Sequence, residues 1–391
     1  MATRWWMLFV IVLLRLAMGY QFQTIASSST HLVENFALSY AEIGTLIGFL
    51  LLPGIVFSVP SGLVTRALAD RTLLLIGCMV MIAGSLVIGL GESVSALYTG
   101  RLLSGIGGAI STVILTKMVT DWFAGYRMIT AMAIMSAAWP GGVGLGLVSQ
   151  GQIADIWGWP WVMHAASLVS GFAFVLTVLF YRDAERPESG NGQIRFGLPY
   201  REFVHMSIVG LSWTMLNACL ILIVSYTPDH LIAGGYDPET ARRITSMVLW
   251  IGIFAIPLSG RVVEHFGLVT SSIVLSMAAT GLLMLLLAGN MFPQFMVPAI
   301  AVAFSISVGS AMSLSAQAVR SVNRGPGLGI FYTWNYIGMA TAPVLAGWSR
   351  DLTGDTAAPI LLSALLAFGV LGATLLFRLL QIAWPIPAEE T

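Results

Sequence analysis

Charged residues are scarce in this chain. Only 9% of its 391 residues are Asp, Glu, Lys or Arg, whereas 57% are hydrophobic, and the formal net charge is zero. A soluble domain carries about 25% charged residues. This scarcity excludes a large soluble catalytic domain. It also argues against a nucleic-acid partner, because no basic run is present to neutralise phosphates.

Cysteine and lysine are nearly absent as well. Cys78 and Cys219 lie in separate apolar runs, and their spacing fits neither a disulfide framework nor a metal site. Lys117 is the single lysine among 18 basic residues. The apolar runs contain no clustered Ser/His, His/carboxylate or metal-ligand set, so we expect no cofactor, no bound metal and no intramembrane enzyme activity.

Long apolar runs dominate the sequence instead. A transmembrane helix needs about 20 apolar residues, and twelve runs meet this requirement. We therefore predict an all-α membrane protein with twelve transmembrane helices in two pseudo-symmetric six-helix bundles. The predicted spans are 5–27, 41–66, 72–91, 95–119, 127–153, 160–182, 201–226, 238–262, 268–290, 293–318, 325–349 and 356–380.

One extended polar stretch divides these spans into equal sets. We predict an N-terminal six-helix bundle over residues 1–182, a cytoplasmic linker over 183–200 and a C-terminal six-helix bundle over 201–391. Equal halves are typical of an internally duplicated transporter. The alternative is that the polar stretch is simply a long loop. Most of the basic residues fall in loops that are cytoplasmic if both termini are cytoplasmic, which predicts that orientation.

Two short loops carry related motifs. The loop after the second span contains Gly62, Arg66, Asp70 and Arg71, and the loop after the eighth contains Gly260 and Glu264. Both resemble the loop signature of the major facilitator superfamily, in which an acid follows a glycine by four residues. In the first copy Arg66 occupies the position of the acid and Asp70 that of a basic residue. The charges are exchanged, so an ion pair of reversed polarity is compatible with this loop.

Two further helices extend the resemblance. Arg101, Gly105 and Gly108 match the arginine and glycine pattern of the fourth helix of that family, and Trp139-Pro140 partly matches a proline-glycine kink of its antiporters. Asp121-Trp122-Phe123 and residues 327–335 are similar to a bacterial subgroup of cyanate and nitroimidazole porters. The resemblance implies a rocker-switch carrier in a bacterial cytoplasmic membrane. The residues assigned to gating or structure are Gly62, Arg66, Asp70, Arg71, Gly105, Gly108, Asp121, Arg127, Pro140, Gly260 and Glu264.

Two arginines are predicted to lie within the bilayer. Arg15 falls near the midplane of the first span, on the same helical face as Gly19 and Gln23. An arginine at this depth costs about 2.5–3.5 kcal/mol even on the most lenient scale, so it is expected to face a cavity or a partner. Arg101 lies nearer the end of its span. Each arginine either binds an anionic substrate or satisfies backbone carbonyls of a neighbouring helix.

No Asp or Glu falls near the middle of a predicted span. Carriers driven by protons commonly place a carboxylate there. We therefore expect uniport, anion exchange, or symport in which the substrate carries the proton. Aromatic and amide side chains near the middle of their spans complete the candidate substrate site, with packing as their alternative role. These further candidates are Trp139, Asn217, Trp250, Tyr332, Asn335 and Tyr336.

The predicted function is secondary transport of a small organic or inorganic anion by alternating access, by a monomer in the lipid bilayer. A multidrug exporter of the same superfamily is the main alternative, favoured by the proline-glycine stretch and the aromatic residues. Such exporters usually carry an embedded acid, which this sequence lacks. A receptor would be expected to add a soluble output domain, and a channel a repeated filter sequence; neither is present.

Overall fold

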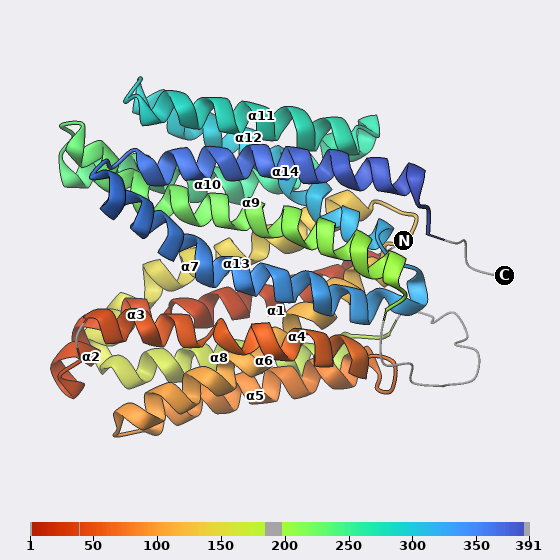
Figure 1. Cartoon of the computed structure of the whole chain (residues 1–391). Helices are drawn as coiled ribbons and strands as arrows, with labels where there is room; N and C mark the ends of the chain where they lie inside the picture. The colour runs from red at the N-terminus through yellow and green to blue at the C-terminus, as the bar shows by residue number, and fades with distance from the viewer. Residues whose placement is uncertain (1, 39, 184–197, 387–391) are drawn as a thin grey trace. The chain divides into compact units, whose positions relative to one another are not determined.

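The computed structural model describes residues 2–38, 40–183 and 198–386 (Figure 1). These residues form helices without any strand, which confirms the predicted all-helical fold. In the N-terminal part the helices are α1 (Ala2–Ser27), α2 (Ser29–Phe36), α3 (Tyr40–Phe49), α4 (Leu52–Val64), α5 (Asp70–Leu90), α6 (Val94–Trp122), α7 (Met128–Trp157) and α8 (Trp159–Phe180). They continue with α9 (Tyr200–Ala233), α10 (Pro238–Phe266), α11 (Val269–Ala288), α12 (Pro293–Ser313), η1 (Leu314–Gln317), η2 (Ser321–Asn323), α13 (Arg324–Thr353) and α14 (Ala358–Ala383).

Eleven segments of the described chain are long and apolar enough to cross a membrane. They coincide with eleven of the twelve predicted spans, and the protein is a multi-pass membrane protein. The eleventh predicted span forms the 30-residue helix α13 but is not among them. Its tyrosine, asparagine, threonine and glycine residues lower its hydropathy.

The second predicted span is not one continuous helix. It breaks at Leu50 and Leu51, between α3 and α4, where the Leu50 N–H donates to Ile47 O at 3.4 Å, a three-residue step. Helix α2 was not predicted at all. Its Leu32 is completely buried and packs with Ile25 and Trp159 in one apolar cluster.

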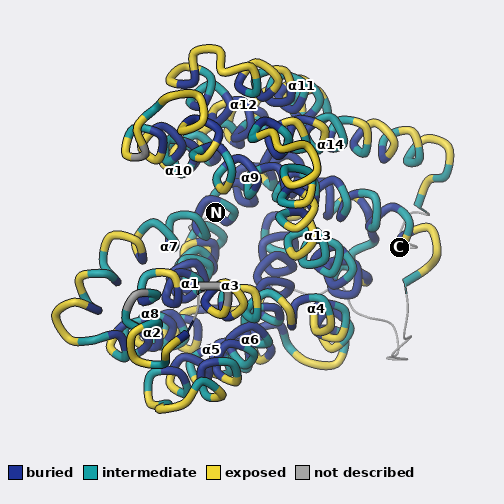
Figure 2. The backbone as a smooth tube through the Cα atoms, turned by 60° about the vertical axis from the view of Figure 1, so that its left-hand side comes forward, coloured by how far each residue is buried: buried dark blue, intermediate teal, exposed yellow. Residues whose placement is uncertain are grey.

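Contacts group the described residues into two compact units. Unit 1 contains residues 2–124 and 138–183 together with Ser321–Thr333. Within it α5 packs against α6 and α8, and α4 also packs against α6 (Figure 1). Helix α6 is the central element of this unit, and Figure 2 shows most of its length as buried.

Unit 2 contains Gly125–Ala137, Leu198–Arg320 and residues 334–386. Within it α14 packs against α9 and α11, and α12 packs against α10 and α11. Helices α7 and α13 each contribute to both units. The predicted domain boundaries at 182 and 201 stay a prediction, and most of the predicted linker, residues 184–197, lies outside the described residues.

Glycines allow the helices of unit 1 to approach closely. A Cβ atom on Gly77 would lie 3.0 Å from Gly107 O, and one on Gly84 would lie 2.5 Å from Gly100 O. Helices α5 and α6 therefore pack backbone against backbone. This contact helps to position α6, which carries Arg101, Thr112 and Thr116.

Candidate functional site

Arg15 lies on α1 and contacts α6. Its Nη1 donates to Thr112 Oγ1 at 3.0 Å, and the side chain is partly buried. The Nε atom is buried and has no hydrogen-bond partner. An unpaired buried donor on a cation is costly unless a ligand or water completes it. Arg15 therefore has the properties expected of an anion-binding residue.

Arg101 directs its donors to backbone carbonyls, unlike Arg15. It is completely buried, and its Nε donates to Leu46 O at 3.1 Å. Its Nη1 and Nη2 donate to the carbonyls of Gln21 and Phe22 at 3.4 and 3.2 Å. Arg101 thus joins α6 to α1 and to the carboxyl end of α3. Its positive charge also interacts favourably with the helix dipole there. This is the structural role given above as its alternative; its substrate-binding role stays a prediction.

Gly19 and Gln23 face α7. A Cβ atom on Gly19 would lie 2.2 Å from Trp139 O, and one on Gly146 would lie 2.9 Å from Gln23 Cβ. Gln23 is buried and donates to Ser27 Oγ at 3.2 Å. Trp139 packs its ring against Phe22 at a centroid distance of 5.1 Å. These contacts hold α1 and α7 together beside Arg15.

Tyr332 belongs to unit 1 with the residues above. Its hydroxyl lies 2.6 Å from Thr116 Oγ1, and Thr116 donates to Thr112 O at 2.9 Å. Thr116 has a single hydroxyl proton, so Tyr332 is the donor to Thr116. A chain of hydrogen bonds thus runs along α6 from Tyr332 to the turn that carries Thr112.

The remaining substrate candidates lie in unit 2. Asn217 donates to Trp213 O at 2.9 Å within its own helix, and Tyr336 is partly buried. The Oδ1 atom of Asn335 is buried without a hydrogen-bond partner. Trp250 is more than half exposed and forms an apolar stripe with Phe254 and Leu258. Such a stripe is typical of a surface that contacts lipid.

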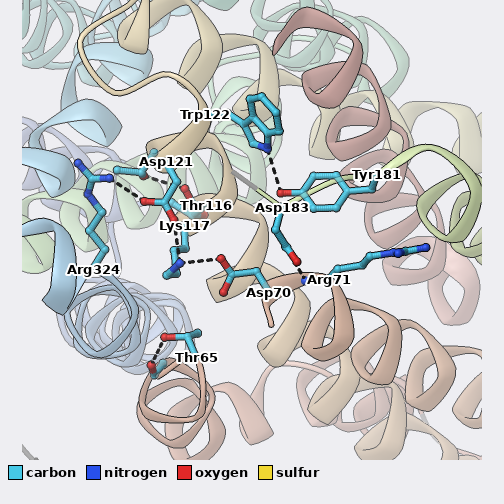
Figure 3. A network of polar contacts seen from close by, with 12 residues as sticks. Thr65, Asp70, Arg71, Thr116, Lys117, Asp121, Trp122, Tyr181, Asp183 and Arg324 are labelled. Carbon is cyan, nitrogen blue, oxygen red and sulfur yellow. Dashed lines mark hydrogen bonds and ion pairs between the residues drawn. The ribbon is translucent and has the colours of Figure 1, made fainter. Parts of the chain in front are cut away.

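Four charged side chains form a chain at one end of α6 (Figure 3). Lys117 Nζ lies 2.6 Å from Asp70 Oδ2 and 2.7 Å from Asp121 Oδ2, and Asp121 Oδ1 lies 2.6 Å from Arg324 Nη1. The single lysine thus bridges two carboxylates. Asp70 and Asp121 were predicted to have structural roles, whereas Arg324 was missed because it lies more than 200 residues from Asp121 in the sequence.

Tyr181 lies beside this chain, just after α8, and accepts a hydrogen bond from Trp122 Nε1 at 3.2 Å (Figure 3). Burial raises the pKa of its phenol well above the usual range, and the nearby carboxylates of Asp183, Asp70 and Asp121 raise it further, against the effect of the Trp122 hydrogen bond. Asp183 also accepts the backbone N–H of Arg71 at 3.1 Å. The phenol therefore stays neutral among these charges.

Arg66 and Gly62 connect α4 to the segment that begins α13. Arg66 Nη2 donates to Asn323 Oδ1 at 2.6 Å, and a Cβ atom on Gly62 would lie 2.2 Å from Gly325 O. On α6, Gly105 packs equally closely, with Leu50 O 2.4 Å from its Cβ position. Gly108 differs, since no atom lies within 4 Å of its Cβ position. The two glycines of α6 therefore differ: Gly105 packs against the backbone of another segment, whereas Gly108 leaves open space beside α6.

Glu264 and Gly260 connect α10 to the start of α7 within unit 2. The Glu264 carboxylate accepts the Ile129 N–H at 3.0 Å and the Thr130 hydroxyl, and so caps the amino end of α7. A Cβ atom on Gly260 would lie 2.5 Å from that of Ala133. Arg127 precedes α7 with a φ of 46°, a left-handed conformation.

Pro140 lies inside α7, three residues after the point at which this helix passes from unit 2 to unit 1. Because proline lacks a backbone donor, one helical hydrogen bond is missing there.

A family model described as the Major Facilitator Superfamily matches residues 7–234, more than half of the chain. The chain belongs to the major facilitator superfamily. Azole resistance protein 1 of Saccharomyces cerevisiae is 27% identical over 147 residues, which cover 37% of this chain and 23% of that protein. The chain matches at most 36% of the length of the curated relatives.

Solved structures share the fold over nearly the whole chain. The transporter FucP of this superfamily, in the outward conformation, has a TM-score of 0.79 at 9% identity, covering 95% of this chain and 98% of FucP. The human organic anion transporter MFSD10 has a TM-score of 0.75 at 17% identity, covering 94% of this chain and 98% of MFSD10. At these identities the similarity concerns the fold alone.

Proposed function

We propose that this protein is a secondary transporter that moves a small anionic solute across a membrane by alternating access. The membership of the superfamily and the eleven apolar spans support transport. Arg15 carries the proposed anion preference, because among the described residues its buried Nε has no partner and Thr112 is its single hydrogen-bond partner. Binding of an anion to a cation that has unused donors inside an apolar helix is favourable, because it supplies the missing partner.

The positions of the acidic residues support the proposed mode of transport. In the described long helices every Asp and Glu lies within two turns of a helix end, as Asp121 and Glu264 do. No carboxylate of this part of the chain is placed for a proton relay at mid-helix. We therefore propose uniport, exchange or symport in which the substrate carries the proton. Membership of the cyanate and nitroimidazole porter group, a bacterial cytoplasmic membrane, cytoplasmic termini and a monomeric state stay predictions.

Drug export is the second candidate function. The match to azole resistance protein 1 favours it, and so do the aromatic side chains of Phe22 and Trp139 beside Arg15. An unpaired arginine disfavours it for cationic drugs, because like charges repel at short range.

Uptake into proteoliposomes tests the proposal. The purified protein is assayed with labelled nitrate, cyanate and benzoate and with a cationic dye, together with Arg15→Ala. Arg350→Ala is the matched control, because Arg350 pairs with Asp229 at an exposed position. We expect uptake of at least one anion that Arg15→Ala abolishes and Arg350→Ala retains. Transport of the dye alone would replace this proposal by the exporter. Proton flux with an anion that cannot be protonated would contradict the proposed coupling.

A further inference from the structure

We propose that Arg15 and Thr112 bind the carboxylate of a monocarboxylate whose compact apolar body lies beside Phe22, Trp139 and Gly108. This inference rests on the proposed anion transport and specifies the class of its substrate. It is built on the donors that Arg15 and Thr112 leave unused, on the number of cations available, and on the surroundings of the site.

The unused edge of the Arg15 guanidinium has the geometry of a carboxylate receptor. Nη1 is engaged by Thr112, Nε is buried without a partner, and Nη2 forms no hydrogen bond with a described residue. Nε and Nη2 lie on the same edge of the planar group, so their two N–H bonds are parallel. Two parallel donors match the two oxygens of one carboxylate and give a bidentate pair. A spherical anion engages such a fork less well.

Thr112 offers one more donor. Its Oγ1 accepts from Arg15, and its own hydroxyl proton has no acceptor among the described residues. The residue is 3% exposed. A hydroxyl can donate once while it accepts, so Thr112 is able to donate to a ligand that Arg15 holds. Gly107, five residues before Thr112 on α6, packs closely against the backbone of Gly77 on α5, which positions this part of α6.

The number of available cations in unit 1 favours a ligand with a single negative charge. Arg101, the other arginine deep in unit 1, uses its donors on three backbone carbonyls. Lys117 is already paired with two carboxylates. Among the described residues of unit 1, Arg71 and Arg324 also have a buried Nε without a partner, but they lie in the first turn of α5 and of α13. Arg15 is therefore the cation of this part of unit 1 that has an unused donor at mid-helix. A dianion would bring a second charge into a low-dielectric site without a partner, which is costly.

An aromatic pair and an open space lie one to two helical turns along α1 and α6 from Arg15 and Thr112. Phe22 lies two turns from Arg15 on nearly the same face of α1, and its ring packs against Trp139. Gly108 lies one turn from Thr112, about 40° around α6, and nothing lies within 4 Å of its Cβ position. The site thus has a polar end at Arg15 and Thr112 and apolar walls, which suit an amphipathic monoanion.

Titration calorimetry of the purified protein tests this inference with four probes of known charge. Benzoate carries one carboxylate, terephthalate carries two, benzamide is the neutral isostere, and chloride is a spherical monoanion. We expect benzoate to bind at least about tenfold more tightly than terephthalate or chloride, and benzamide to show no binding. This ratio corresponds to about 1.4 kcal/mol.

Three variants separate the contributions, and each is first checked for an unchanged melting temperature. Arg15→Lys keeps the charge but not the two parallel donors, so benzoate should lose about tenfold in affinity while chloride changes little. Thr112→Val keeps the shape but not the hydroxyl and should weaken benzoate by about three- to tenfold. Gly108→Val fills the open space and should weaken benzoate but not acetate.

The outcomes distinguish the two proposals. Tighter binding of terephthalate or chloride, with loss of binding in Arg15→Ala, would overturn the monocarboxylate and leave the anion transporter intact. Equal losses for benzoate and chloride in Arg15→Lys would overturn the fork geometry. Binding of benzamide as tight as that of benzoate, unchanged in Arg15→Ala, would overturn both the inference and the anion transporter.

Discussion

Gly62 and Gly325 are in backbone contact: a Cβ atom on Gly62 would lie 2.2 Å from the carbonyl oxygen of Gly325. The contact is reciprocal, because a Cβ atom on Gly325 would lie 2.6 Å from Gly62 O. It joins α4 to the first turn of α13. The glycine of the loop signature is therefore required by close approach rather than by an unusual backbone angle.

The substitution Gly62→Ala should separate these two helices. The added methyl group meets backbone that has no freedom to rotate away, and such overpacking costs about 1–3 kcal/mol. We expect a lower melting temperature in detergent. Gly44→Ala on α3 is the matched control, because nothing lies within 4 Å of its Cβ position and alanine improves helix propensity. A Gly62→Ala variant as stable as Gly44→Ala would contradict the close contact.

Lys117 should be essential for the stability of unit 1. The Lys117→Met substitution removes the ammonium group that lies 2.6 Å from the carboxylate of Asp70, a residue that is 5% exposed. Breaking a buried ion pair on one side costs about 3–5 kcal/mol, so we expect a large fall in the melting temperature.

A double variant provides the control for Lys117. In Lys117→Met with Asp70→Asn, the carboxylate charge next to position 117 is removed as well, so part of the stability should return. If the double variant is as unstable as the sum of the single variants, the pair at 2.6 Å is not coupled.

The helices follow from the sequence to a large extent because apolar length alone determines them in a membrane. The break between α3 and α4 does not follow from the sequence. The residues at the break are leucines, which carry no signal for a helix end. The Leu46 carbonyl is instead satisfied by Arg101, 55 residues away. A break that depends on a partner in another helix leaves no local pattern.

The candidate site shows the same limit. Depth in the bilayer singled out both Arg15 and Arg101 and gave each two alternative roles. What separates them is the partner of each donor. Thr112 lies 97 residues from Arg15, and the carbonyls that Arg101 contacts lie on α1 and α3. Neither partner is visible from the local sequence. The open space at Gly108 is likewise set by neighbouring helices rather than by α6.

Glu264 should stabilise the amino end of α7 through its charge. The Glu264→Gln substitution keeps one acceptor for the Ile129 N–H but removes the negative charge at the helix terminus. Losing such a cap costs about 0.5–2 kcal/mol. Glu239→Gln on the same helix α10 is the matched control, since Glu239 pairs with Arg243 at the exposed surface and such pairs contribute about 0–1 kcal/mol. Equal melting temperatures for the two variants would contradict the capping role.

Arg101 and Arg15 should respond to truncation in opposite ways. Arg101→Ala leaves the carbonyl of Leu46 and those of Gln21 and Phe22 without this donor in a fully buried position. Each buried unsatisfied group costs about 1–3 kcal/mol, although the α1 carbonyls also accept helical bonds and should cost less. We expect Arg101→Ala to lose its folded state in detergent.

Arg15→Ala removes a cation whose Nε is already unpaired, so its melting temperature should stay the same or rise while anion binding is lost. Melting curves measured without and with benzoate check both expectations. A stable Arg101→Ala protein that no longer binds benzoate would instead assign Arg101 to the substrate.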